Sequence, residues 1–312
     1  MLDWKDIQIF LEVARNQRLT DASRRLGLDH STLSRRTRLF EQKLNTQLFD
    51  RSTRGYNLTD AGQQLLAYAE LMAQNATEAT EILSNKNRQI RGKIRLGVTE
   101  GFGSWVIAPL LCKFGQHHPS ITIDILTLPR FVNLSRHEAD LAITIERPSN
   151  QGLVVSRLCD YRLQLYAGKK YLSTNSEPAS ISELSRHRLI GYVNDFIFSD
   201  QLNYLDPLLP LSPPSNHECF SIRGTSVITQ YHATLHGAGL AILPCFMAEP
   251  TEELSCILKK EVDVVRQFWI TARQDQRRLA RVRLLWDYLR KALDINKDFL
   301  MGITSQLIIP EI

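Results

Sequence analysis

The sequence predicts two unlike parts, a small helical N-terminal domain and a larger α/β domain, joined by a long helix. Apolar residues recur at helical spacing from Trp4 to Leu44, whereas short apolar strands alternate with helices from Lys93 onward. The stretch between these parts is rich in Leu, Ala, Glu and Gln and has no Gly after Gly62. A chain of 312 residues has room for two or three such domains.

The N-terminal part reads as three short amphipathic helices. In the second, we expect Thr20 to be the N-cap and Gly27 to end the helix in the left-handed conformation. We expect Asp29 to cap the third helix, with its carboxylate accepting backbone N–H groups. The inward faces of the first and third helices are expected to consist of Trp4, Ile7, Phe10, Leu11 and Ala14, and of Leu33, Thr37, Phe40 and Leu44.

The opposite face of the third helix carries hydroxyl, imidazole and guanidinium groups, which suit phosphate oxygens and base edges. From Ser34 to Arg54, six basic residues outnumber two acidic ones. A charge run alone is usually only a solvated face, but one placed on a helix-turn-helix followed by a basic hairpin favours DNA binding. The candidate DNA-contacting residues are His30, Ser31, Thr32, Ser34, Arg35, Arg38, Arg51 and Arg54.

The segment from Asp3 to Gly62 resembles the winged helix-turn-helix of LysR-type transcriptional regulators, and its wing motif begins at Leu48. The resemblance implies that the third helix enters the major groove and that Arg54 of the wing approaches the minor groove. Three positions depart from the family's usual pattern, namely His30, Ser31 and Thr37. The resemblance therefore implies the docking mode but does not identify the operator bases.

Residues 63–91 are expected to form a linker helix and a hinge. Leu58, Leu65, Met72 and Ala79 recur every seven residues, with Ala69, Ala76 and Leu83 beside them. An ordinary surface helix is one interpretation. Because a single helix between two domains would have nothing to pack on, we favour pairing with a second copy. Two DNA-binding units would then read an inverted repeat, as a homodimer or a homotetramer.

Residues 92–300 resemble the effector domain of the same family, an α/β fold of two subdomains built like a periplasmic binding protein. Strands such as 94–98, 121–126 and 140–145 alternate with helices, as in a doubly wound domain. Subdomain I is expected at about 92–161 and 267–300, and subdomain II at about 162–266. The crossovers would lie near 159–162 and 264–267, and a tail at 301–312 extends beyond the resemblance.

Ligand sites in such domains lie at the carboxyl ends of strands beside helix N-termini. This rule, and the family resemblance, give one candidate set of effector-binding residues: Thr99, Glu100, Phe102, Thr127, Leu128, Thr144, Arg147, Thr225 and Ser226. Thr225 and Ser226 begin a helix whose N–H groups suit an anion. Glu100 and Arg147 keep two interpretations, recognition of a zwitterionic ligand or a structural ion pair.

Other motifs carry weaker signals. Gly101-Phe-Gly103 lacks the third glycine of a dinucleotide site. Five cysteines without a Cys-x-x-Cys pair indicate reduced thiols, with a redox switch between two of them as the alternative. His232 and His236 are four residues apart but have no third ligand nearby, so no metal and no cofactor is expected.

These features together predict a ligand-responsive transcriptional regulator rather than an enzyme. Its partners would be promoter DNA, a small-molecule effector and further copies of itself, with RNA polymerase as a further candidate. A net charge of +5 requires DNA affinity to come from local placement of cations. We expect a cytoplasmic protein with no membrane partner, because no apolar run or signal segment is evident. The alternative is a solute-binding or sensor protein without a direct role in transcription.

Overall fold

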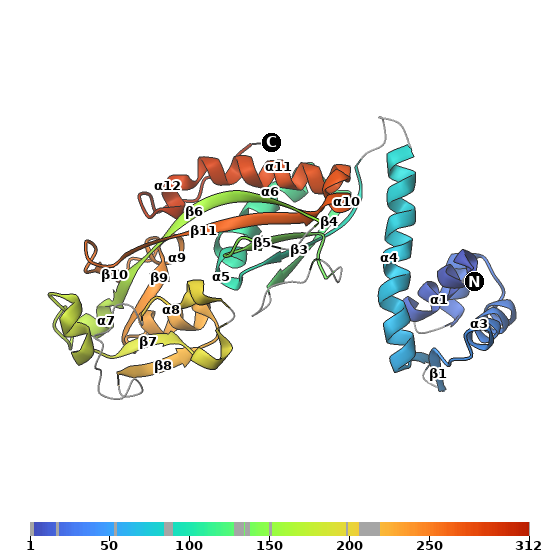
Figure 1. The fold of residues 1–312 in the computed structure, drawn as a ribbon, viewed down its shortest axis with the longest axis horizontal. Helices are drawn as coiled ribbons and strands as arrows, with labels where there is room; N and C mark the ends of the chain where they lie inside the picture. The colour runs from blue at the N-terminus through green and yellow to red at the C-terminus, as the bar shows by residue number, and fades with distance from the viewer. Residues whose placement is uncertain are drawn as a thin grey trace. The chain divides into compact units, whose positions relative to one another are not determined.

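A computed structural model describes residues 3–16, 19–52, 55–83, 90–127, 134, 138–149, 152–197, 199–205 and 219–311. The chain divides into two compact units, Met1–Arg88 and Gln89–Ile312. We call them the DNA-binding unit and the effector unit, after the expectations above. Figure 1 shows the elements of both.

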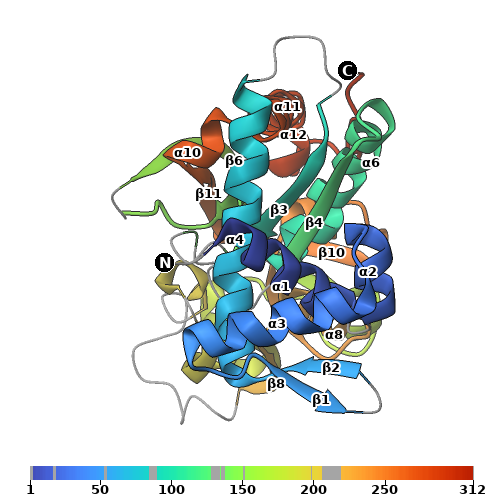
Figure 2. The same cartoon turned by 90° about the vertical axis from the view of Figure 1, so that its right-hand side faces the viewer.

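The DNA-binding unit consists of short helices, a hairpin and one long helix (Figures 1 and 2). Its strands β1 and β2 pair antiparallel, with Phe49 opposite Leu58. The elements are α1 Trp4–Asn16, α2 Leu19–Leu26, α3 His30–Leu44, β1 Phe49–Ser52, β2 Gly55–Leu58 and α4 Asp60–Leu83.

An aromatic core holds this unit together. The ring of Phe10 lies 6.4 Å from that of Phe40 and 5.3 Å from that of Phe49, measured between centroids. The predicted inward face of α3 is confirmed, since Leu33, Thr37 and Phe40 are buried. The buried Thr37 hydroxyl is satisfied because it donates to the carbonyl of Leu33 at 2.9 Å.

Helix α4 corrects one expectation. Ala69 is fully buried in the core of its own unit, and Leu65, Leu66 and Ala73 pack against the same core. One face of the helix therefore does pack on its own unit, and Leu65 is partly buried in that contact. The other face leaves Tyr68 68% exposed and Met72 38% exposed.

Two predicted caps also need correction, while the predicted stop is confirmed. Gly27 has φ +63°, the left-handed conformation that favours glycine. Thr20 lies inside α2, because the helix already begins at Leu19. Asp29 does occupy the N-cap of α3 with extended backbone, but its carboxylate makes no capping hydrogen bond.

The effector unit is built on one mixed sheet with the strand order β4-β3-β5-β11-β6-β9-β7-β8, and β10 pairs with β6. The pairs β3–β4, β3–β5, β7–β8 and β7–β9 are parallel. The strands are β3 Gly92–Val98, β4 Ile121–Thr127, β5 Leu141–Thr144, β6 Leu153–Gly168, β7 Leu189–Tyr192, β8 Phe220–Gly224, β9 Leu240–Pro244, β10 Leu254–Ile257 and β11 Asp263–Arg273.

Strands β6 and β11 run antiparallel along the whole length of β11 and connect two subdomains (Figure 1). Subdomain I contains β3, β4 and β5, and subdomain II contains β7, β8 and β9. The predicted crossover segments lie in this pair, where Arg162 stands opposite Val265 and Asp160 opposite Gln267.

Helices cover the sheet on both subdomains. In Figure 1, α11 lies along the β6–β11 pair and α8 lies against β7 and β8, while α6 packs against α11. The inward face of α11 consists of four buried residues, namely Val282, Leu285, Trp286 and Leu289. The helices are α5 Glu100–Phe102, α6 Ala108–His117, α7 Lys169–Leu172, α8 Val227–Leu235, α9 Cys245–Ala248, α10 Gln274–Arg278, α11 Ala280–Ile295 and α12 Lys297–Leu300, with a π-helical turn at Gly103–Ile107 and 3-10 turns at Ile181–Arg186, Asn194–Phe196 and Asp200–Leu202.

The tail after α12 is part of this unit. The Asn296 side chain donates to the carbonyl of Ile308 and accepts from its amide, both at 2.7 Å. Leu307 packs against the core. The buried Asn296 therefore fixes the tail by paired hydrogen bonds, which no local pattern in the sequence indicated.

Candidate DNA interface and effector cavity

The outer face of α3 displays the side chains that the sequence proposed for DNA. His30, Ser31, Arg35 and Arg38 are exposed, and Thr32 and Ser34 are half-buried. The hydroxyls of Ser34 and Tyr56 lie 3.4 Å apart, which links α3 to strand β2. Within the described residues, no carboxylate pairs with Arg35 or Arg38. Their guanidinium groups are therefore available for phosphate oxygens or base edges.

Two charged residues of the same segment serve the fold. Lys43 pairs with Asp6 of α1 at 2.7 Å, and this hydrogen bond raises the pKa of Lys43. The buried carboxylate of Glu41 accepts from the amides of Leu48 and Phe49, both at 3.0 Å. Glu41 thereby fixes the turn that aims the hairpin, a role that its place in a basic run did not reveal.

The wing is described only in part. Arg51 lies in β1 opposite Tyr56, but its side chain is outside the described residues. Arg54 is outside them altogether. The assignment of both arginines to DNA stays a prediction.

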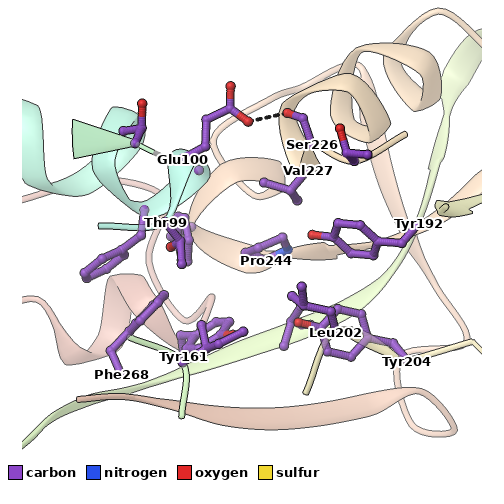
Figure 3. Close-up of a pocket in the computed structure, with 17 residues that line it drawn as sticks. Thr99, Glu100, Tyr161, Tyr192, Leu202, Tyr204, Ser226, Val227, Pro244 and Phe268 are labelled. Carbon is purple, nitrogen blue, oxygen red and sulfur yellow. Dashed lines mark hydrogen bonds between the residues drawn. The ribbon is translucent and has the colours of Figure 1, made fainter. Parts of the chain in front are cut away.

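A cavity of about 280 Å³ lies in the effector unit where the two subdomains meet (Figure 3). Subdomain I supplies the loop after β3 and the ends of β4 and β5, and subdomain II supplies the ends of β7 and β9 and the start of α8. Strands β6 and β11 supply Tyr161, Leu163 and Phe268, while α9 and the 3-10 turn Asp200–Leu202 with the segment after it supply Phe246, Leu202 and Tyr204. The lining residues are Thr99, Glu100, Gly101, Phe102, Thr127, Ile145, Tyr161, Leu163, Tyr192, Leu202, Tyr204, Thr225, Ser226, Val227, Pro244, Phe246 and Phe268.

The structure brings together most of the predicted effector-binding residues. Those that line the cavity are Thr99, Glu100, Phe102, Thr127, Thr225 and Ser226. Leu128 lies outside the described residues. Thr144 and Arg147 are not among the lining residues. Thr144 is buried and donates to the carbonyl of Glu146 at 2.7 Å, and the Arg147 guanidinium lies 5.5 Å from the ring centroid of Trp269.

The partner of Glu100 lies across the cavity. Its Oε2 accepts a hydrogen bond from the hydroxyl of Ser226, as the dashed line in Figure 3 shows. The same hydroxyl accepts from the amides of Ile228 and Thr229, at 3.1 and 3.4 Å, so Ser226 is the N-cap of α8. Glu100 thus bonds to Ser226 rather than forming the suggested ion pair with Arg147.

A second carboxylate–serine hydrogen bond joins the subdomains outside the cavity. The hydroxyl of Ser199, which precedes the 3-10 turn Asp200–Leu202, donates to Oε1 of Glu146, which follows β5. Each bond joins a carboxylate of subdomain I to a hydroxyl of subdomain II. These two hydrogen bonds therefore join the subdomains in addition to strands β6 and β11, and a ligand or solvent can compete for them.

Aromatic rings dominate the rest of the lining. The ring of Phe268 stacks on those of Phe102 and Tyr161, with centroids 3.9 and 4.3 Å apart. Burial raises the pKa of Tyr161, Tyr192 and Tyr204, so all three phenols stay protonated at neutral pH. The sequence did not single out these tyrosines. Only Tyr192, the last residue of β7, fits the strand-end rule.

The glycines of Gly101-Phe-Gly103 are explained by packing. A Cβ at Gly101 would lie 2.7 Å from Cγ1 of Val227 and 3.0 Å from Sδ of Met247. A Cβ at Gly103 would lie 2.9 Å from Cγ1 of Val98. Glycine allows this loop to approach its neighbours closely, and no dinucleotide is needed to explain the motif.

The cysteines and histidines give little support to a redox switch or a metal site within the described residues. Sγ of Cys245 and Sγ of Cys256 lie 3.7 and 3.4 Å from Oε1 of Gln164, and all five cysteines are free. Burial raises the pKa of Cys245 to about 11 and of Cys256 to about 12, which keeps both thiols protonated and unreactive. The described residues contain no group of three or more His, Cys, Asp or Glu side chains suited to a metal ion.

The fold and the two sites define a class of protein: a helix-turn-helix unit with an exposed cationic helix, attached to a ligand-binding α/β unit. Residues 4–63 match the family described as bacterial regulatory helix-turn-helix protein, lysR family, and residues 87–294 match the LysR substrate binding domain. The chain belongs to the LysR family of bacterial regulatory proteins. Within the described residues, every helix is too short or too polar to cross a membrane.

Relatives and solved structures agree with this assignment. The transcriptional regulator PtxR of Pseudomonas aeruginosa is 27% identical over 79% of this chain and 78% of its own length. The regulator CrgA of Neisseria meningitidis serogroup C is 26% identical over 60% of this chain, a match that spans 63% of CrgA. The solved structure of CrgA covers 94% of this chain and 99% of its own, with TM-score 0.57 and 22% identity.

A structure of full-length CbnR complexed with its target DNA shares the fold as well. It covers 93% of this chain and 99% of its own, with TM-score 0.58 and 14% identity. Because the family is one of regulators and the relatives are named as transcriptional regulators, this chain is a DNA-binding transcriptional regulator with an effector-binding domain, not an enzyme.

Proposed function

We propose that this regulator binds an inverted-repeat operator through α3 and that a small molecule in the effector cavity changes its DNA-bound conformation. The observation that carries the proposal is a cavity lined by both subdomains, bridged across by the Glu100–Ser226 hydrogen bond. A ligand there contacts both subdomains at once, so it stabilises one relative arrangement over others. RNA polymerase is a candidate partner at the promoter, and the cytoplasm, where bacterial DNA lies, is the expected location.

Two copies of the chain are needed to read two half-sites. The exposed face of α4 supports self-association, because Tyr68, Met72, Ala76 and Ala79 follow one another at helical spacing and are exposed within the DNA-binding unit. Pairing of this face with a second copy would cover the large apolar side chains that the unit leaves in solvent.

Self-association is tested with the double substitution Tyr68→Lys and Met72→Lys. It places cations in the proposed seam, and we expect a smaller assembly in sedimentation experiments and weaker binding to a two-half-site operator. Gln63→Lys adds a cation on the opposite side of α4, at an exposed position, and should leave the assembly intact. An unchanged assembly in the double variant would exclude this face as the contact.

The effector cavity is tested by screening small molecules for thermal stabilisation of the full chain. A ligand at about 100 times its Kd adds roughly 2.7 kcal/mol to the stability of the unit that binds it. Thr225→Trp places a bulky side chain at an exposed position of the cavity lining and should abolish that stabilisation. Thr304→Trp makes the same change in the exposed tail and should not.

A DNA footprint with and without the stabilising compound completes the test. We expect the compound to change the protected region in the native protein and in Thr304→Trp, but not in Thr225→Trp. If Thr225→Trp keeps both the thermal shift and the footprint change, the effector binds elsewhere. A chain that binds ligand but never changes its footprint would favour the alternative, a sensor without a direct role in transcription.

A further inference from the structure

The charge around the effector cavity indicates which ligands it takes. This inference rests on the proposed function, because it assumes that the cavity is the effector site. Among the described residues that line it, Glu100 is the one charged side chain, and no Lys, Arg or His is present. An anionic ligand would meet a carboxylate and no cation among these residues, whereas a cationic ligand would be attracted to Glu100.

Guanidinium groups near the cavity are engaged with rings of the protein. Arg147 lies 5.5 Å from the ring centroid of Trp269, Arg266 lies 5.8 Å from that of Tyr204, and Arg223 lies 4.2 Å from that of Phe220. None of the three arginines lines the cavity. Each guanidinium lies over an aromatic ring of the protein, and the field of Arg266 reaches Tyr161 and Tyr204, whose pKa values it lowers against the larger effect of burial.

The helix N-terminus that the sequence offered to an anion is already occupied. Ser226 caps α8 and also donates to Glu100, so a carboxylate of the protein sits where an anionic ligand group would sit. A carboxylate has acceptor capacity beyond the single bond that Ser226 makes. Glu100 can therefore hold Ser226 and accept from a ligand ammonium at the same time.

The Glu100 charge reaches the aromatic side of the cavity. Its field contributes to the raised pKa of Tyr192, after burial and the neighbouring Tyr204. Figure 3 shows Tyr192 and Tyr204 on the side of the cavity opposite Thr99 and Phe268. A cavity of about 280 Å³ is small for a ligand site, whose usual range is about 300–1,000 Å³, and suits a compound with a single ring.

We propose that the effector is a small single-ring aromatic amine, cationic at neutral pH. Its ammonium lies beside Glu100, and its ring packs among Tyr192, Tyr204 and the stacked rings that include Phe268. The face of a tyrosine ring also attracts a cation, which adds to the preference for an amine.

Three probes with the same phenol ring separate charge from shape. Tyramine ends in an ammonium, tyrosol in a hydroxyl and 4-hydroxyphenylacetate in a carboxylate. Calorimetric titration of the full chain is expected to give the lowest Kd for tyramine, a Kd about tenfold higher for tyrosol and weaker binding still for the carboxylate.

Two matched substitutions locate the charge. Glu100→Gln keeps the size of the side chain and an oxygen that can accept from Ser226 but removes the charge, so the Kd ratio of tyrosol to tyramine should fall from about ten to about one. Glu146→Gln makes the same change in the other carboxylate–serine bond, outside the cavity, and should leave that ratio unchanged. Circular dichroism checks that both variants are folded.

Several outcomes overturn the ligand class. They are tightest binding of 4-hydroxyphenylacetate by the native protein, an unchanged ratio in Glu100→Gln, or no binding of any of the three probes. None of these outcomes contradicts the proposed function, because the comparison of Thr225→Trp with Thr304→Trp detects a cavity ligand of any class. The converse result is tyramine binding that depends on Glu100 but leaves the footprint unchanged. That result would support the proposed ligand class and contradict the proposed change in DNA-bound conformation.

Discussion

The two units of this chain present their candidate functional side chains in opposite ways. The DNA-binding unit offers one helix face whose exposed cations, such as Arg35 and Arg38, have no carboxylate partner within the described residues. The effector unit assembles its cavity from many separate elements, and its charged residue Glu100 is already bonded to Ser226. A surface for a large polyanion needs exposed charge, whereas a site for a small molecule needs enclosure and satisfied polar groups.

The largest expected effect tests whether each unit has its own core. Phe268→Ala removes a ring stacked on Phe102 and Tyr161, and Phe40→Ala removes a ring of the Phe10 core. Each should cost about 3–5 kcal/mol, because a buried ring leaves a cavity behind. Hydrogen exchange resolved by unit is the suitable measurement, since one unfolding free energy is not defined for two domains.

We expect Phe268→Ala to lower protection only in residues 89–312 and Phe40→Ala only in residues 1–88. Phe196→Ala, at an exposed side chain, serves as the control and should change neither. Loss of protection in both units from either core substitution would show that the two units do not fold independently.

How far the sequence predicted each unit follows from the same contrast. Periodicity specified the buried face of α3, and Gly27 marked the end of α2, because both depend on residues close together in the chain. Glu41 escaped notice, since its hydrogen bonds to Leu48 and Phe49 depend on a turn whose geometry no local pattern encodes.

The sequence could predict only those lining residues of the cavity that follow the ends of strands. Thr99, Thr127 and Ser226 follow the strand-end rule and line the cavity. Tyr161 lies in the middle of β6 and Tyr204 in an irregular segment, so their meeting depends on long-range pairing that one sequence does not display. The Asp29 cap failed for a different reason: a residue type suited to capping occupies the position without making the bond.

A smaller effect is expected from Glu41→Ala in the DNA-binding unit. It leaves two buried amides without their acceptor and should cost about 2–3 kcal/mol. Glu41→Gln keeps an acceptor oxygen and should lose clearly less. Chemical denaturation of the isolated residues 1–88 measures both, provided that the exchange experiment above shows independent folding. Equal losses in the two variants would mean that charge, rather than the hydrogen bonds, matters here.

The N-caps of α8 and α3 are expected to contribute differently to stability. Ser226→Ala removes hydroxyl bonds to the amides of Ile228 and Thr229 and should cost the effector unit about 1 kcal/mol. Asp29→Ala removes a residue without a capping bond and should cost the DNA-binding unit only about 0.5 kcal/mol through the helix dipole. Ser226→Thr should restore most of the loss. A larger cost at Asp29 would indicate that its carboxylate caps α3 in solution.

The smallest expected effect is a loss of stability of the effector unit at alkaline pH. Every cysteine lies in the effector unit, where burial raises the pKa of Cys245 to about 11 and of Cys256 to about 12. In the unfolded chain these thiols ionise near pH 9, so the stability they contribute is complete below that pH and is lost as pH rises toward 12. Melting temperatures between pH 8 and 10.5 should fall more steeply for the effector unit, and Cys256→Ala should reduce the difference in slope. Equal slopes in the two units would contradict this reasoning.

The central claim is that the exposed cations of α3 bind DNA while the paired Lys43 serves the fold. The direct measurement is the salt dependence of binding to a duplex selected from random sequence, for the native chain, Arg35→Ala and Lys43→Ala. We predict that Arg35→Ala weakens binding and reduces the slope of log K against log salt by about 1, and that Lys43→Ala keeps the native slope. An unchanged slope in folded Arg35→Ala, or a reduced slope in Lys43→Ala alone, would contradict the claim.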